Sequence, residues 1–119
     1  MVTSDLSARI NDVLRYVGIT RNMNAYMILS QALTLIAEDE DRLRAVEKES
    51  YTPIADKTLR GPRAVQSTVR RASKVAWDFF SDRVQELAGY PLNGRPSAVA
   101  MLELLYNGVA RYDDLSILK

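Results

Sequence analysis

The segment that most constrains the fold of this chain is 62–78, because its apolar residues repeat with the period of an α-helix. Val65, Val69, Ala72 and Ala76 are separated by four, three and four residues. This spacing places them on one stripe of a helix, and an apolar stripe is stable only against a hydrophobic core. The pattern therefore predicts a helix over 62–78 with one buried side.

The other side of this helix is rich in positive charge. Between Lys57 and Lys74 the chain has no Asp or Glu. The basic residues of this stretch are Lys57, Arg60, Arg63, Arg70, Arg71 and Lys74. Gln66 and Ser67 add hydrogen-bonding groups to the same side. Basic side chains bind phosphates, and Arg and Gln also read base edges, so this chemistry suits double-stranded DNA.

The residues before this helix predict a helix-turn-helix over about 51–79. A shorter helix there would have a narrow apolar edge made of Ile54, Ala55 and Leu59. Gly61 then permits a tight turn, and Pro62 suits the first turn of a helix. In a helix-turn-helix the second helix lies in the major groove. The alternative interpretation is an ordinary pair of packed helices with a solvated charged face.

The rest of the chain also predicts helices, and its fold class is all-α. We expect a first helix after Ser4 or Asp5 that stops at Gly18 and a second from about residue 25 to 36. Residues 41–50 form either another short helix or a continuation of the second one. Another short helix should follow the aromatic residues near Trp77, which we assign to the core, and a last one should start near Ser97. This gives a compact bundle of about six helices in a single domain, 1–119, similar to winged-helix proteins but without a clear wing.

Composition argues against several functional classes. The chain has no Cys and no His, which excludes a disulfide framework, a zinc finger and a histidine base. We therefore expect no enzyme activity, no cofactor, no metal and no small-molecule substrate. There is no signal peptide and no long apolar run, so we expect a cytoplasmic protein without a membrane partner.

In this order the elements resemble the C-terminal DNA-binding effector domain of the sporulation initiation response regulators of endospore-forming bacteria. The likeness is carried by a first helix ending in VGI, a second helix followed by an acidic stretch, YTPIADK running into VRRASKVAW, and a late GY followed by a Pro-Ser helix start. The match is ungapped from about Leu6 to Trp77. The resemblance implies a recognition helix over 62–78 in the major groove of a short asymmetric box. It also implies a homodimer on tandem sites.

Some positions depart from the pattern of that family. Arg70 matches a basic position that contacts DNA, and Arg71 stands where the family tends to have histidine. Gln66 replaces a glutamate, and Ala64 and Ser67 stand where the family has arginines that read bases. Since Arg recognises guanine and Gln recognises adenine, these departures predict duplex binding with a different preference, either richer in A/T or weaker.

These considerations divide the predicted DNA-binding residues into two groups. Those expected at the groove are Arg63, Gln66, Ser67, Arg70 and Arg71. Those expected at phosphates are Lys57, Arg60 and Lys74. Arg95 joins the second group because it precedes the helix start at Pro96-Ser97, and helix N-termini bind phosphate.

A second hypothesis is a helical protein-interaction module that has lost DNA binding and acts through a partner regulator. The missing arginines at Ala64 and Ser67 favour it. The resemblance also includes an N-terminal receiver domain, for which this chain has no counterpart before its first helix. We therefore expect no receiver within residues 1–119.

Overall fold

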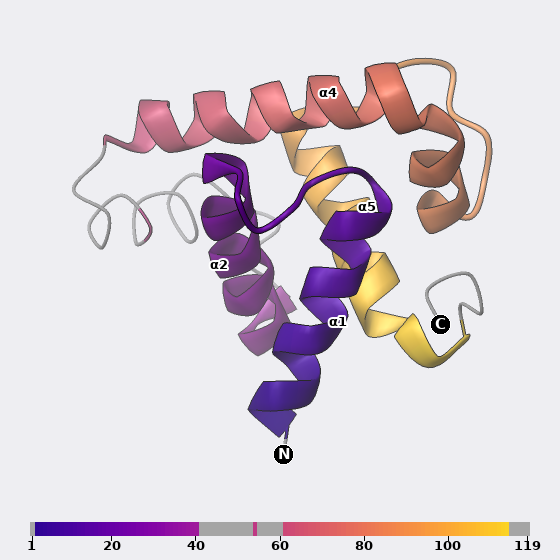
Figure 1. The fold of residues 1–119 in the computed structure, drawn as a ribbon. Coiled ribbons are helices and arrows are strands. Elements are labelled where there is room, and N and C mark those ends of the chain that lie inside the picture. Colours follow the sequence, from indigo (N-terminus) through magenta and orange to yellow (C-terminus); the bar gives the residue numbers. More distant parts are fainter. Residues whose placement is uncertain (1, 41–53, 55–60, 115–119) are drawn as a thin grey trace.

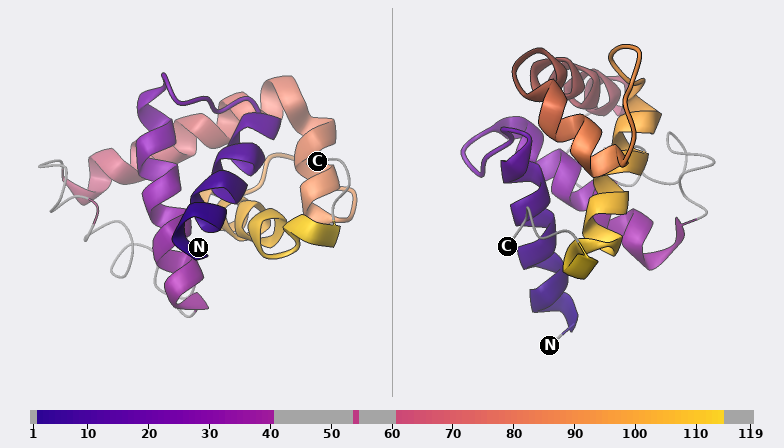
Figure 2. Two further views of the ribbon diagram at one scale, coloured as in Figure 1. Left: turned by 60° about the horizontal axis from the view of Figure 1, so that its bottom comes forward. Right: turned by 90° about the vertical axis from the view of Figure 1, so that its right-hand side faces the viewer.

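The computed structural model describes residues 2–40, 54 and 61–114. In this part of the chain it has four α-helices, α1 (Val2–Tyr16), α2 (Asn24–Glu38), α4 (Pro62–Ala88) and α5 (Ala98–Ala110), and one 3-10 helix, η3 (Tyr112–Asp114). No strand occurs among these residues. The long helix α4 lies across one end of α1, α2 and α5 (Figures 1 and 2). One side of α4 therefore meets the other helices and the other side is turned away from them.

The all-α fold class is confirmed, but the expectation of about six helices is not matched. The short helix expected around Val84 is present as the last part of α4, which a non-helical residue, Phe80, separates from the part before it and which ends at Ala88. The expected helix within 41–50 and the first helix of the helix-turn-helix lie outside the described residues, apart from Ile54. The first helix begins at Val2, slightly earlier than the cap residues Ser4 and Asp5 indicated.

The predicted apolar stripe of the long helix is confirmed. Val65, Val69, Ala72 and Ala76 are all buried in the core. Both α2 and α5 pack against α4. Trp77 is half-buried and packs against the core, as its place next to Ala76 predicted. Burial of this stripe fixes which side of α4 can face a partner.

A joint at Phe80 divides α4 into two segments, 62–79 and 81–88. Phe80 has a non-helical backbone conformation (φ −137°, ψ 34°). Its ring lies against Gly18, which ends the turn after α1 with φ +87°; a Cβ added there would lie 2.3 Å from the ring. Glycine is needed at this position both for its backbone conformation and for the close approach of the ring. The contact joins residues 62 positions apart, so local sequence patterns do not reveal it.

Specific hydrogen bonds hold the C-terminal part of the fold. Ser97 caps α5 by accepting a hydrogen bond from the Ala100 backbone N–H at 3.2 Å, which confirms the predicted helix start. Arg9 of α1 forms an ion pair with Asp113 of η3 at 3.0 Å.

Within the described residues, no helix combines the length and apolar character needed to cross a membrane.

Candidate nucleic-acid interface

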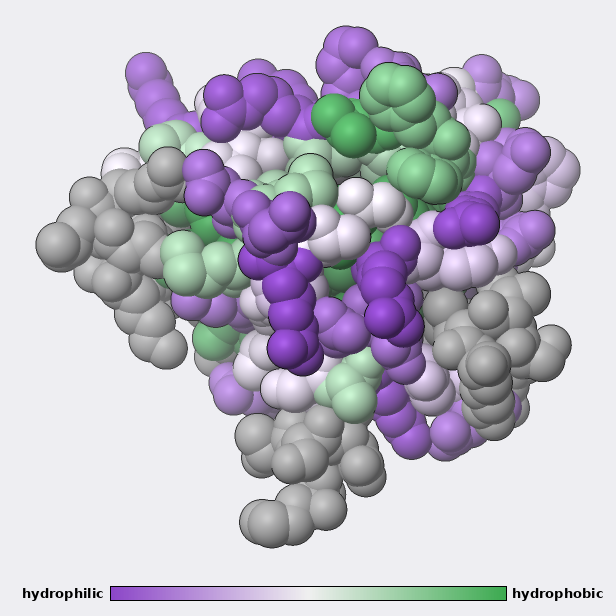
Figure 3. All heavy atoms as spheres, viewed as in Figure 1, coloured by the Kyte–Doolittle hydropathy of each residue, from purple (hydrophilic) through white to green (hydrophobic). Residues whose placement is uncertain are grey.

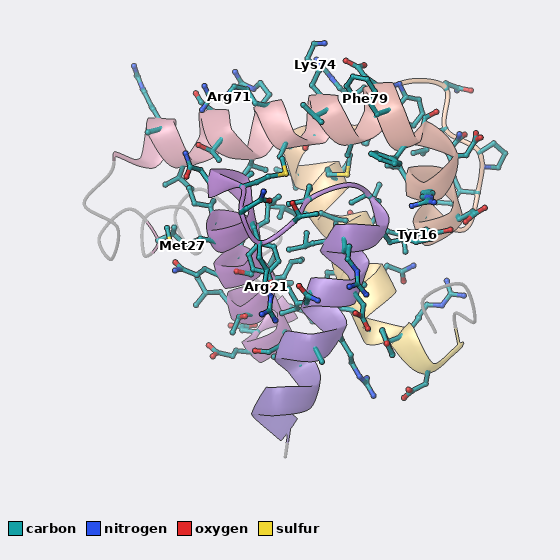
Figure 4. The ribbon with its side chains drawn as sticks, in the orientation of Figure 1. Tyr16, Arg21, Met27, Arg71, Lys74 and Phe79 are labelled. Carbon is teal, nitrogen blue, oxygen red and sulfur yellow. The ribbon has the colours of Figure 1, made fainter. Side chains whose placement is uncertain are left out.

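The predicted DNA-binding residues of α4 lie together on the side turned away from the core. The exposed members are Arg63, Ser67, Arg70, Arg71 and Lys74, and Gln66 is partly exposed at their edge. We call these six residues the basic face. Figure 4 shows Arg71 and Lys74 projecting from α4 away from the rest of the protein. At about 1.5 Å per residue, the basic face extends about 16 Å along the helix axis.

The polar residues between the two sides of α4 are satisfied internally. Thr68 and Ser73 are buried, and their hydroxyls donate to the backbone carbonyls of Ala64 (3.0 Å) and Val69 (2.9 Å). The hydrogens of these two hydroxyls are therefore used within the helix. The first acidic residue of α4 is Asp78, which pairs with Lys74 at 2.7 Å. This pair marks the end of the basic face.

Arg95 lies beside the basic face although it is distant from it in sequence. A groove of about 280 Å³ is lined by Gln66, Arg70 and Arg95 together with Ser97, the cap of α5. The loop that carries Arg95 is held to α4 because the Leu92 backbone N–H donates to Gln85 Oε1 at 2.7 Å. The structure thus brings two arginines and the start of α5 to one groove.

The start of α2 also borders the basic face, which the sequence analysis did not predict. A groove of about 200 Å³ is lined by Arg71 and Val75 of α4 and by Met23, Asn24 and Ala25 at the beginning of α2. No side chain caps α2 at this end. The sequence already shows that the start of this helix, MNAY, has no acidic residue in its first turn. The position of this helix start beside α4, however, depends on tertiary packing.

Exposed apolar residues follow the basic face along α4. Phe79 is 75% exposed and Val75 is 39% exposed. Figure 3 shows a hydrophobic area over α4 among hydrophilic surroundings. Phe79 follows Ala76 by three residues and Ala72 by seven, so helical spacing alone would place it on the buried stripe. Its exposure next to the joint at Phe80 is therefore a feature that local spacing does not reveal.

Two of the predicted residues, Lys57 and Arg60, lie outside the described residues. The same holds for Ala55 and Leu59 of the predicted first helix. Ile54, from the same stretch, is buried in the core. Nowhere in residues 2–40, 54 and 61–114 do three acidic side chains gather in a way that could hold a metal ion.

The comparison with protein families agrees with this geometry. The model of the family described as "Sporulation initiation factor Spo0A C terminal" matches residues 10–109. This range includes α2 and α4 completely, α1 from Ile10 onward, and all of α5 except its last residue, Ala110. The chain belongs to the Spo0A C-terminal family. Members of that family are DNA-binding effector domains that regulate transcription in sporulation, and the family is not an enzyme family.

Membership in the Spo0A C-terminal family confirms the resemblance inferred from the sequence. It also supports a DNA-binding regulator in general, with double-stranded DNA as the partner. The basic face of α4, Arg95 and the groove between them are the part of the described structure with the charge suited to that partner.

Proposed function

We propose that this protein is a transcription regulator that binds double-stranded DNA sequence-specifically, with the recognition helix 62–78 in the major groove. The observation that carries the proposal is the basic face: an exposed, acid-free stretch of α4 opposite a buried apolar stripe. The major groove is about 12 Å wide and admits one α-helix. Because α4 lies at the surface of the bundle, its outward side is accessible to a duplex.

Within the basic face, the residues nearest the start of α4 are proposed to read bases. Arg63, Gln66 and Ser67 lie in the first two turns, which in a helix-turn-helix face the base edges. Arg70 and Arg71 extend this surface by one turn. An Arg pairs with guanine through two hydrogen bonds and a Gln pairs with adenine in the same way, each contributing about 1–3 kcal/mol of discrimination.

The remaining cations are proposed to bind phosphates. Lys74 is one turn further along α4 and is partly neutralised by Asp78. Arg95 stands before the α5 N-terminus, where backbone N–H groups and the helix dipole favour an anion. Lys57 and Arg60 belong to this group by their place in the sequence. Such contacts fix the register of the protein on DNA without reading its sequence.

The target is proposed to differ from the usual target of the family. Ala64 is exposed on the outward side of α4 and Ser67 carries only a hydroxyl, so neither can supply the two hydrogen bonds of an arginine. Gln66 can pair with adenine. We therefore expect a preference for a site with fewer guanines. By analogy with the family, two copies would bind adjacent sites in the same orientation.

Selection of bound duplexes from a randomised pool tests this proposal. The wild type should enrich a defined site, and Arg70→Ala should relax the preference at one position of it. Arg111→Ala is the matched control, because Arg111 is exposed at the end of α5, next to the C-cap of α4. Recovery of random sequences by the wild type would contradict specific recognition. Enrichment of the usual box of the family would contradict a changed target.

One observation favours a second candidate function, a module that acts through a protein partner. Phe79 and Val75 are exposed beside the basic face, and exposed apolar residues of this size are common at protein contacts. The two functions differ in salt dependence. DNA binding should weaken steeply between low and physiological salt, whereas a module without DNA binding should shift no duplex even at low salt.

A further inference from the structure

A cavity of about 590 Å³ lies between α1 and α2 and is independent of the basic face. Of the described residues, those that line it come from α1, α2 and the segment between them, together with Ile54; none comes from α4. Its apolar wall includes Ile10, Leu35, Ile54 and the partly buried Tyr26. A cavity of this size and mixed lining is typical of sites for small organic molecules.

One wall of the cavity presents hydrogen-bond acceptors. Gln31 Oε1 is buried and receives no hydrogen bond from any described residue. The hydroxyls of Ser30 and Thr34 donate to the backbone carbonyls of Met27 (3.0 Å) and Ser30 (2.8 Å). Their hydrogens are therefore used, while their oxygen lone pairs remain. Since a buried acceptor without a donor is unfavourable, this wall suits a ligand group that donates several hydrogen bonds.

The same cavity has a cation at its edge. The Arg21 Nε–H donates to Asn11 Oδ1 at 3.2 Å, and the Tyr26 hydroxyl donates to the same oxygen at 3.1 Å. Figure 4 shows the Arg21 side chain between α1 and α2. A guanidinium has five N–H donors, and this contact uses one of them. Arg21 is thus held beside the cavity with donors suited to a carboxylate.

Negative charge on the other side of the cavity narrows the choice of ligand. Glu38 also lines it, one helical turn beyond Thr34. The choice of ligand therefore depends on the hydrogen-bonding groups of the lining. An ammonium group has three N–H donors, which suit Gln31 Oε1 and the hydroxyl oxygens of Ser30 and Thr34, and a carboxylate suits Arg21.

We propose that the cavity between α1 and α2 binds a small amino acid, that is, a molecule with one carboxylate, one ammonium group and an apolar body. The carboxylate pairs with Arg21, and the ammonium group donates to Gln31 Oε1 and the neighbouring hydroxyl oxygens. The apolar body packs on Ile10 and Leu35. The amino acid is a bound ligand and not a substrate. This proposal does not depend on the residues of the basic face.

Calorimetric titration of the full chain with four six-carbon probes tests the proposal. L-norleucine and 6-aminohexanoate have the same atoms but differ in where the ammonium group is attached, so they sample two charge spacings. Hexanoate lacks the ammonium group and hexylamine lacks the carboxylate. We expect saturable binding of at least one of the two amino acids, and at least about tenfold weaker binding of both hexanoate and hexylamine. Failure of both amino acids to saturate below about 10 mM would overturn the proposal, as would equal binding of hexanoate or hexylamine.

Three variants place the ligand in this cavity. Arg21→Gln should weaken binding of the better amino acid at least about tenfold, and Arg111→Gln, an exposed arginine outside the cavity, should not change it. Gln31→Met keeps the shape of the side chain and removes the buried acceptor. Gln31→Met should weaken binding of the amino acid, while the unliganded variant should be at least as stable to urea as the wild type. If Arg21→Gln fails to fold, the binding measured with Gln31→Met tests the proposal on its own. Unchanged binding in Gln31→Met would overturn the proposal.

Discussion

The two segments of α4 have similar burial but opposite charge. Segment 62–79 buries four small or medium apolar residues, and segment 81–88 buries Val84 and Leu87. The outward side of the first has arginines and a lysine with no acidic residue before Asp78, whereas the second has Asp82 and Glu86 around a single cation, Arg83. Burial therefore explains how both segments hold the fold. Charge alone explains why only the first suits DNA.

The cation of the second segment is used within the protein. Arg83 donates to the Tyr16 backbone carbonyl at 3.2 Å and lies over the rings of Tyr16 and Phe80, 5.0 and 5.4 Å from their centres. Tyr16 in turn donates a hydrogen bond to Glu86. These contacts tie the second segment to α1, whereas among the described cations of the first segment only Lys74 forms an ion pair, with Asp78.

The largest expected effect comes from breaking the joint between the segments. Gly18→Ala forces an unfavourable backbone conformation and places a methyl group into the Phe80 ring. We expect the free energy of unfolding to fall by about 2–5 kcal/mol, measured by urea denaturation. Gly94→Ala is the control, since nothing lies within 4 Å of the added Cβ, and it should change stability by less than about 0.5 kcal/mol. Equal effects of the two substitutions would mean that the joint does not stabilise the fold.

The second largest effect tests the difference in charge between the two segments of α4. Arg70→Glu should weaken binding to a duplex at least about tenfold at low salt, because it removes a cation of the basic face and adds an anion. Arg111→Glu makes the same charge change next to the end of the second segment and should have a much smaller effect. Fluorescence anisotropy with a labelled duplex measures both. Similar losses would show that only the net charge matters.

The smallest effect concerns pH and the second segment only. Burial, with a contribution from the Glu86 carboxylate, raises the pKa of Tyr16 to about 12 from its ordinary value of 10.0. The folded protein thus holds the phenol proton more tightly than the unfolded chain. The stabilisation is complete below about pH 10 and is lost as pH rises toward 12.

Tyr16→Phe removes this contribution. The free energy of unfolding of the wild type should fall more steeply than that of Tyr16→Phe between about pH 10 and pH 12. The comparison with the variant also cancels the contribution of Tyr106, whose pKa is raised to about 12 by burial and by Glu40. If the free energies of unfolding of the wild type and of Tyr16→Phe fell in parallel over this pH range, a raised pKa of Tyr16 in the folded protein would be excluded.

The sequence predicted the parts of the molecule that depend on local pattern. Helical spacing identified the buried stripe of α4, and a serine before an apolar run identified the start of α5. The same spacing identified the outward positions of Arg63, Arg70 and Lys74. These features follow from residues within a few turns of one another, so no tertiary information was needed.

Features created by contacts between distant residues could not be predicted in this way. Local patterns predicted the two helical segments of α4, but they did not reveal that the joint between them at Phe80 packs against Gly18. The cavity beside Gln31 exists because α1 and α2 leave space between them. The groove between Arg70 and Arg95 depends on how the loop before α5 folds back onto α4.

We propose that the outward side of segment 62–79 is the surface that meets DNA. Backbone amide NMR of the full chain, titrated with a selected duplex, locates the surface in contact. We expect the largest chemical-shift changes within residues 63–74 and around Arg95, with small changes over 81–88. If the changes were concentrated over 81–88 and residues 63–74 were unaffected, the DNA-binding surface would not be on this segment.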